Sequence, residues 1–234
     1  IFHSADFKID HTPVVGEGWD DARFADIVAE RPVKAMTCDS TNVFSTHAGR
    51  SEATLAEPLT ELIRTQSGMV VATTFGSNVA RLKTLAEAAR AAGRTVCVLG
   101  RSMKRMLSAS EEAAVLSGIP KTVSPEEALE VPRRNLMILA TGSQGERRAA
   151  SAQLSRGKYL GLEMKEGDTF LFSSKTIPGN ERDVLRVWNA FSEMGVQVID
   201  DQGGKYHVSG HANRTDLEHV HRLILPDMLI PMHG

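Results

Sequence analysis

The sequence has few cysteines, no long apolar run and no secretion signal. Its 234 residues include two cysteines, Cys38 and Cys97, each inside an apolar segment. We therefore expect two buried thiols in a reducing, cytoplasmic environment rather than a disulfide-stabilised fold. No apolar stretch approaches the roughly 20 residues that a membrane-spanning helix needs. These absences predict a soluble globular protein without a membrane partner.

The sequence also lacks a net charge of either sign and a recognisable metal-ligand cluster. Lys and Arg number 27 against 29 Asp and Glu, so the formal charge at pH 7 is −2. Any binding of RNA or DNA must then come from local groups. No HxHxDH or CxxC motif occurs, so these residues alone cannot build a complete metal site. The opening residues resemble a strand in progress, and we expect residues to be missing before Ile1.

Short apolar runs alternate with segments of helical periodicity through the middle of the chain. The runs predict strands at 69–74, 95–99, 136–141, 169–172 and 196–199. Helices are expected at 79–92, 103–116, 146–155 and 181–194, and an earlier one at 51–66 contains Pro58, which implies a kink or a later start. This alternation is typical of an α/β protein with a doubly wound parallel sheet.

The two ends of the chain do not follow this alternation. The first 45 residues and the last 28 or so contain strand-like pieces at 2–9, 33–41 and 228–234, and a helical stretch at 214–225. The pattern indicates an α/β module inserted into another domain, whose two halves flank the module in sequence.

Small polar loops follow four of the predicted strands, at 74–78, 100–102, 141–146 and 173–180. Ligands bind at the carboxyl ends of parallel strands, and free backbone amides there attract phosphate. Helix capping explains any single loop equally well, but the four together favour a phosphate-binding edge. Nearby cations could add positive potential or simply be solvated: Arg81, Arg101, Lys104, Arg105, Arg147 and Arg148.

Several histidines and carboxylates stand in strand-end or loop contexts. His207 and His211 flank a serine in HVSGHA, and His233 lies in IPMHG. Imidazoles there can ligate metal, donate to phosphate or transfer a proton, although a structural or exposed pair is the simpler interpretation of the spacing. Asp6 lies between strand-like FHSA and FKI, and Asp39 ends the apolar run KAMTC. A carboxylate at the end of a strand can bind a divalent metal. The alternatives are a solvated charge for Asp6 and an Asx-turn cap for Asp39.

Eight short motifs occur in a fixed order: SADFKID, CDSTN, TTFGSNVAR, GRSM, TGSQGE, SSKTIPGNE, HVSGHA and IPMHG. Together they resemble the ribonuclease J family, of the β-CASP group within the metallo-β-lactamase superfamily. The resemblance runs nearly end to end. It implies a β-CASP doubly wound parallel sheet domain inserted into a metallo-β-lactamase αββα domain, of which only part is present. The implied boundaries are 1–46 and 206–234 for the metallo-β-lactamase part and 47–205 for the β-CASP domain.

The resemblance also assigns site residues. Asp6 and His233 match metal ligands, Asp39 matches the acidic motif that supports the site, and His211 matches the catalytic histidine beside the scissile phosphate. The loops at 142–146 and 173–180 are similar to motifs that line the same cleft. The residues that match substrate-binding positions are Ser77, Asn78, Val79, His207, Val208, Ser209, Gly210 and His211.

The implied function is that of a zinc-dependent ribonuclease, a 5′-to-3′ exonuclease with endonuclease activity in some members, in RNA maturation and decay. The resemblance implies two Zn²⁺ ions per site, with Mn²⁺ or Mg²⁺ as alternatives, 5′-monophosphorylated single-stranded RNA as partner, and a homo-oligomer. Without HxHxDH, the chain alone is expected to be inactive. One alternative is a non-catalytic RNA-binding or assembly module that kept the cleft but lost the metals. Another is a metallo-hydrolase acting on DNA or small phosphodiesters.

Overall fold

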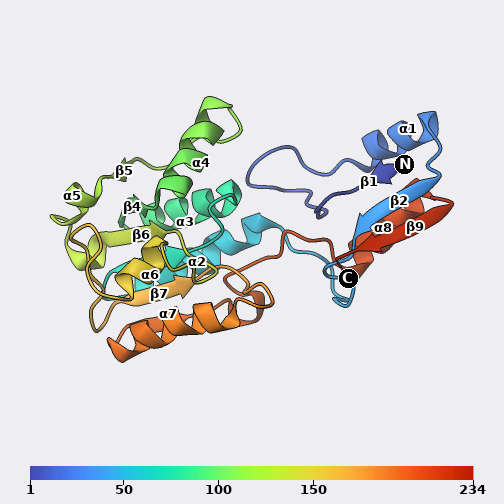
Figure 1. Cartoon of the computed structure of the whole chain (residues 1–234). Helices are drawn as coiled ribbons and strands as arrows, with labels where there is room; N and C mark the ends of the chain where they lie inside the picture. Colours follow the sequence, from blue (N-terminus) through green and yellow to red (C-terminus); the bar gives the residue numbers. More distant parts are fainter. Residues whose placement is uncertain (234) are drawn as a thin grey trace. The chain divides into compact units, whose positions relative to one another are not determined.

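A computed structural model describes residues 1–233, which divide into two compact units (Figure 1). Unit 1 contains Ile1–Ser51 together with residues 208–233, and unit 2 contains Glu52–His207. Unit 2 thus interrupts unit 1 once in the sequence, as expected for an inserted module. The domain boundaries implied by the resemblance, after residues 46 and 205, stay a prediction.

Unit 2 is built on a six-stranded sheet in which every pair of neighbours is parallel. This confirms the predicted α/β class, and all five predicted strands are present with ends shifted by no more than one residue. One edge strand of two residues, β5, was not predicted because so short a segment carries no periodic pattern. The strand order is β5 (Thr122–Val123), β4 (Thr95–Leu99), β6 (Leu136–Ala140), β3 (Val70–Thr73), β7 (Thr169–Phe172) and β8 (Gln197–Ile199).

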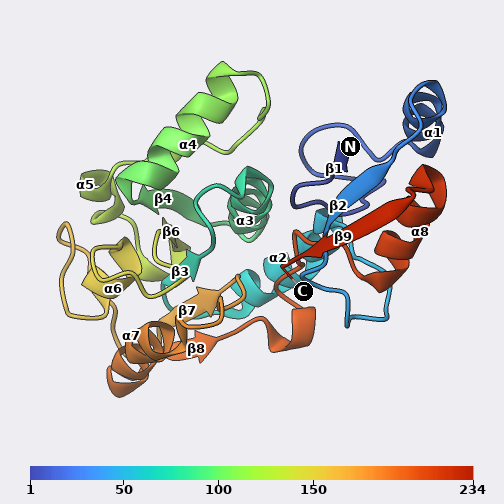
Figure 2. The same ribbon diagram turned by 45° about the vertical axis from the view of Figure 1, so that its right-hand side comes forward.

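Helices cover both faces of this sheet, and Figure 2 shows α3 and α6 on opposite sides of β6. Alternate strand residues such as Val71 and Phe170 face α6 and α7, and share a core with Val187 and Phe191. Helices α2 and α3 pack against each other, and α3 contacts β4 and β6. The principal helices are α2 (Ala56–Thr65), α3 (Val79–Ala91), α4 (Arg101–Glu112), α6 (Ala150–Leu154) and α7 (Glu181–Glu193), with a short α5 (Pro125–Ala128) that was not predicted.

Three helix predictions needed correction at their ends. Helix α4 begins two residues before, and ends four residues before, the predicted bounds of 103–116. Helix α6 is half the predicted length, because residues 146–149 form a separate turn closed by Ala149 N–H donating to the Glu146 carbonyl at 2.9 Å. A 3-10 turn, η1 (Glu52–Leu55), precedes α2, so the later start is the correct alternative. Pro58 then lies in the first turn of α2, where its missing N–H leaves no helix bond unmade.

Unit 1 contains a three-stranded parallel sheet with the order β1 (Phe2–His3), β2 (Ala35–Asp39) and β9 (Met228–Met232). Met36 and Cys38 of β2 pack against Val220 and Ile224 of α8 (Arg214–Ile224). Helix α1 (Asp21–Glu30) contacts α8 and was not predicted. The predicted strand at 2–9 is wrong beyond residue 3, because the chain turns away at Ala5, where φ is 49°.

Both cysteines are buried and free, as predicted. Within residues 1–233, no helix is both long enough and apolar enough to cross a membrane.

Candidate active site

The sheet of unit 1 brings polar side chains to one edge. Asp39 is the last residue of β2 and pairs in register with Met232, so His233 follows directly at the end of β9. Asp6 follows the end of β1, which runs parallel to β2. Because parallel strands end at the same edge of a sheet, three segments far apart in sequence deliver their carboxylates and imidazole together.

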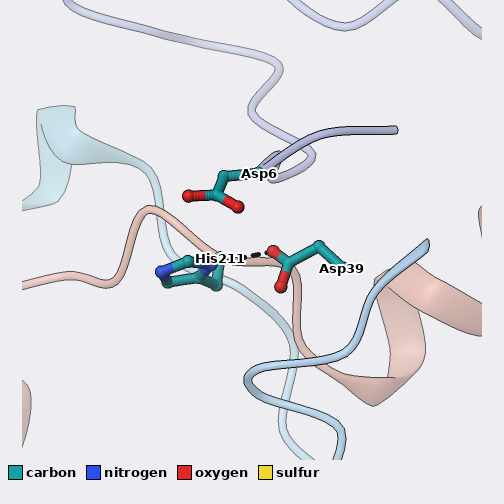
Figure 3. A group of neighbouring side chains, drawn as sticks. All are labelled: Asp6, Asp39 and His211. Carbon is teal, nitrogen blue, oxygen red and sulfur yellow. Dashed lines mark hydrogen bonds and ion pairs between the residues drawn. The ribbon is translucent and has the colours of Figure 1, made fainter. Parts of the chain in front are cut away.

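Asp6, Asp39 and His211 form a compact group (Figure 3). One potential ligand atom from each residue lies within 4.8 Å of those from the other two. Figure 3 shows the Asp6 carboxylate over the Asp39–His211 pair, with the three side chains on three separate segments. The structure therefore brings together three residues that the resemblance had assigned separately.

The two oxygens of Asp39 have different partners. Oδ1 accepts hydrogen bonds from the backbone N–H of Thr41 at 3.0 Å and from its hydroxyl at 2.6 Å. Oδ2 accepts from Nδ1 of His211 at 2.8 Å. The Asx-turn interpretation of Asp39 is therefore confirmed for Oδ1, and the site role of this residue stays a prediction.

The environment of Asp39 favours its ionised form. Only 1% of the side chain is exposed, and this burial by itself raises the pKa of the carboxyl. Hydrogen bonds from Thr41 and His211 outweigh the burial, so the pKa lies below its ordinary value of 3.8. The site thus holds a buried negative charge next to an imidazole.

The carboxylate also decides the tautomer of His211. An ionised carboxylate only accepts hydrogen bonds, so Nδ1 of His211 must carry the hydrogen in this contact. The neutral ring then has its lone pair on Nε2, which can accept a proton or ligate a metal. With 31% of its side chain exposed, His211 is accessible to a ligand.

Asn42 and Ser209 shape the backbone around His211. The Asn42 side-chain amide donates to the hydroxyl of Ser209 at 2.9 Å and to the carbonyl of His211 at 3.2 Å. The same hydroxyl accepts from the backbone N–H of His211 at 3.1 Å. Ser209 is therefore occupied by its own loop, which adds a structural role to its predicted substrate role. Asn42 was not predicted, although it stands in the quoted CDSTN motif.

The two predicted metal ligands lie beside each other. Nδ1 of His233 is 3.8 Å from a carboxylate oxygen of Asp6, and the two side chains are 62% and 64% exposed. His233 lies outside the group of three but shares Asp6 with it. The structure thus places both predicted ligands at the edge that also holds Asp39.

In unit 2, one arginine connects the predicted substrate-binding segments. Asn78 caps α3 by accepting from the backbone N–H of Arg81 at 3.0 Å, and Val79 is the first residue of that helix. The Arg81 side chain in turn lies 3.1 Å from Nδ1 of His207. Ser77 is exposed next to this cap. Val208 and Gly210, the other predicted contacts, belong to unit 1, where Val208 is buried and Gly210 is exposed.

Gln144 joins the two loops that resemble cleft-lining motifs. Its side-chain N–H donates to the carbonyl of Lys175 at 3.0 Å, and its oxygen accepts from the backbone N–H of Ile177 at 2.8 Å. Asn180 donates to the same oxygen at 3.2 Å. The loops at 142–146 and 173–180 therefore form one polar edge after β6 and β7, as parallel strands predict.

The suggestion that Arg81 supplies positive potential at the surface is wrong. Its side chain has no exposed area and forms a two-point ion pair with Glu52, which neutralises its charge. The other cations considered, Arg101, Lys104, Arg105, Arg147 and Arg148, are exposed, so their solvation or use by a ligand both stay open.

Comparison with known proteins identifies the family of this fold and site. A family model described as "Ribonuclease J, beta-CASP domain" matches residues 67–191, which is more than half of the chain and includes most of unit 2. The chain belongs to the ribonuclease J family. The predicted family and the predicted β-CASP fold are thereby confirmed.

Curated relatives of the family match over the full length of this chain. Ribonuclease J of Sinorhizobium meliloti is 40% identical over 234 residues, and ribonuclease J of Thermus thermophilus is 35% identical over 234 residues. Ribonuclease J 1 of Streptococcus pyogenes is 34% identical over 236 residues. Each match covers 100% of this chain but 41% or 42% of the relative, so the chain spans about two fifths of their length.

Proposed function

We propose that this chain contributes the Asp39–His211 catalytic pair to a zinc-dependent ribonuclease that hydrolyses RNA phosphodiester bonds. The observation that carries the proposal is this buried, hydrogen-bonded pair beside the exposed carboxylate of Asp6. Relatives named ribonuclease J support RNA as the substrate. The finer proposals are 5′-to-3′ exonuclease action on 5′-monophosphorylated single strands, with endonuclease action as a second mode, in a cytoplasmic homo-oligomer.

The donor set at the carboxyl edge fits a divalent metal. Carboxylate oxygen and imidazole nitrogen are ordinary zinc ligands, and Mn²⁺ or Mg²⁺ would also accept the carboxylates. Both oxygens of Asp39 are engaged by Thr41 and His211. Asp6 and His233 are exposed and adjacent, so we assign them as the ligands and Asp39 with His211 as the neighbouring catalytic pair.

We assign proton transfer at the scissile phosphate to His211. When bound, zinc would supply an activated water and neutralise charge on the phosphate. Asp39 holds the ring by Nδ1, which leaves Nε2 as the nitrogen that exchanges a proton. Protonated His211 would then donate to the leaving 3′ oxygen or stabilise negative charge on the phosphate.

Two ligands make a weak metal site, because structural and catalytic zinc sites in proteins use three or four protein ligands. We therefore expect the 234-residue chain alone to bind zinc weakly and to cleave RNA slowly or not at all. Isothermal titration of the chain with Zn²⁺, and of Asp6→Ala and His233→Ala variants, would measure this. Tight binding that survives both substitutions would contradict the ligand assignment.

A chimera tests the proposed function directly. These 234 residues would replace the matching segment of Sinorhizobium meliloti ribonuclease J, and cleavage of a 5′-monophosphorylated RNA oligonucleotide would be followed with zinc present. We expect cleavage of RNA and not of a DNA oligonucleotide of the same sequence. In the chimera, His211→Ala should lower turnover by about 10²–10⁴-fold, as expected for loss of a general acid or base.

RNA affinity distinguishes this role from binding alone. The His211→Ala chimera should bind RNA within a few-fold of the unsubstituted chimera, and His219→Ala, on α8, serves as the matched histidine control. If affinity collapsed while turnover of bound RNA stayed normal, the catalytic role would be wrong. A folded, zinc-loaded chimera that binds RNA without cleaving it would favour the non-catalytic RNA-binding alternative.

A further inference from the structure

A fully buried arginine in unit 2 binds both the first and the last residue of that unit. Arg81 lies in the first turn of α3, and its Nε and Nη2 donate to the two carboxylate oxygens of Glu52, the second at 2.8 Å. Glu52 is the first residue of unit 2 and is 5% exposed. Two parallel N–H···O contacts fix the plane of the guanidinium group.

The remaining guanidinium nitrogen faces the other end of the unit. Nη1 of Arg81 donates to the carbonyl and to the hydroxyl of Ser173, both at 3.0 Å, and lies 3.1 Å from Nδ1 of His207. The Ser173 hydroxyl donates to the carbonyl of Tyr206 at 2.6 Å, which holds the segment just before His207. Arg81 therefore ties the carboxyl end of β7 to the last residue of unit 2.

The contact with Arg81 decides which nitrogen of His207 carries the hydrogen. A guanidinium group is always protonated in proteins and has donors only. Nδ1 of His207 must therefore accept, so the ring is neutral and its hydrogen is on Nε2. The carboxylate of Asp39 has the opposite effect on His211, whose hydrogen is on Nδ1. Two histidines four residues apart are thus held in opposite tautomers.

We propose that Arg81 is a positioning residue that keeps His207 as a neutral Nε2–H donor for a phosphate oxygen of the substrate. The proposal rests on the proposed ribonuclease function for the identity of that phosphate. The ion pair with Glu52 offsets the free-energy cost of burying the Arg81 charge. Without a partner, a guanidinium group would be strongly disfavoured at a site with no solvent exposure. His207 would then bind a phosphate oxygen of the substrate as a hydrogen-bond donor.

The tautomer can be measured without RNA. Long-range ¹H–¹⁵N correlation spectra of the full chain, labelled with ¹⁵N-histidine, distinguish an unprotonated Nδ1 from an unprotonated Nε2. We expect the Nε2–H pattern for His207 and the Nδ1–H pattern for His211 in the same spectrum at pH 7.5. A protonated Nδ1 on His207 would overturn the proposal, whatever the outcome of the cleavage assay.

Substitutions test whether Arg81 is what fixes the tautomer of His207. The double variant Glu52→Met, Arg81→Met removes both buried charges and keeps apolar volume, so it is expected to fold. His207 should lose its fixed Nε2–H pattern in this variant, whereas His211, held by Asp39, should keep its own. Arg90→Met, an exposed position on the same helix, is the matched control and should leave both histidines unchanged.

The effect on substrate separates positioning from folding. In the chimera, the double variant should raise KM for RNA about tenfold, the loss expected for one hydrogen bond to a charged group, with kcat changed less than about twofold. Arg81→Lys keeps a charge but cannot reach both Glu52 and His207, so it should raise KM as well. Arg81 would be structural only if the His207 spectrum were unchanged in the double variant. The same conclusion would follow if kcat fell by as large a factor as KM rose in both variants.

Discussion

At the residue scale, two buried side chains each contact partners of one kind, either hydrogen-bond donors or hydrogen-bond acceptors. Asp39 accepts from Thr41 and His211, and Arg81 donates to Glu52, Ser173 and His207. The side chains of Asp39 and Arg81 are 1% and 0% exposed, so water cannot substitute for their partners. Replacement of one group by its neutral isostere therefore leaves a specific donor or acceptor unpaired.

Asp39→Asn tests whether a neutral isostere leaves a buried hydrogen-bonding group unpaired. An amide can accept from His211 or from Thr41 through its one oxygen, and its NH₂ group then faces a donor. We expect a loss of about 1–3 kcal/mol in the free energy of unfolding at pH 7, measured by urea denaturation with a chelator present. The exposed Asp26→Asn, also in unit 1, is the control and should change stability by less than about 0.5 kcal/mol.

The pH dependence of that loss follows from the lowered pKa of Asp39. The folded state favours the ionised carboxyl, so the stabilisation is complete above the ordinary value of 3.8 and is lost as pH falls through the lower folded pKa. The difference in the free energy of unfolding between wild type and Asp39→Asn should therefore shrink as the pH falls below about 4. A difference that stays unchanged as the pH falls from about 4 to about 2 would show that the carboxyl is not held ionised.

At the scale of elements, unit 2 depends on loops that fit closely against helices. Gly145 lies in the loop between β6 and α6 with φ of 72°, and a Cβ there would lie 2.3 Å from the backbone of Asp183 in α7. The same loop is bound by Gln144 to the loop after β7. The polar edge of the sheet is therefore held by packing against α7 as well as by hydrogen bonds.

Gly145→Ala should lower the free energy of unfolding more than Gly179→Ala, a substitution at another glycine with positive φ. Gly179 also has a positive φ, 97°, but a Cβ there meets nothing within 4 Å. We expect Gly179→Ala to cost about 1–2 kcal/mol from the left-handed backbone alone. Gly145→Ala should cost about 1–3 kcal/mol more, because backbone must move. Thermal unfolding of both variants gives the comparison, and equal shifts would show that the loop relaxes freely.

At the scale of the whole molecule, each of the two units contains a hydrophobic cluster of its own, and the two clusters differ in origin. The core of unit 2 draws on one continuous segment, from Met69 to Val196. The core of unit 1 combines residues from both ends of the chain, Met36 and Cys38 with Val220 and Ile224. The cited cluster of unit 2 therefore needs no residue of the flanking segments, whereas the cluster of unit 1 needs both ends of the chain.

Residues 52–207, expressed alone, should fold and unfold cooperatively, as a domain with its own core does. Near-ultraviolet circular dichroism and a urea titration would measure this. Phe170→Ala, at a side chain 1% exposed in the core, should cost about 3–5 kcal/mol equally in the segment and in the full chain. A non-cooperative transition of the segment, or a cost confined to the full chain, would show that unit 2 depends on unit 1.

The sequence by itself determined most of the strands and helices of unit 2, and it nominated the residues of the candidate site. The strands at 95–99 and 169–172 were predicted to the residue, because apolar β-branched runs between helical periods are local signals. Helix α1, β5 and the turn at Ala5 were not predictable in this way, since short amphipathic or two-residue elements depend on what they pack against. Asp6, Asp39, His211 and His233 were named from their motifs alone.

Only the tertiary structure decided how these residues act on one another. Asp39 and His211 are 172 positions apart and meet through one hydrogen bond, and Arg81 reaches Glu52 and His207 across 29 and 126 positions. No local pattern encodes such partners, so Arg81 was misread as a surface cation and Glu52 gave no signal. Tautomers and pKa values depend on the nearest donor or acceptor in space, and that neighbour is set by packing of distant segments.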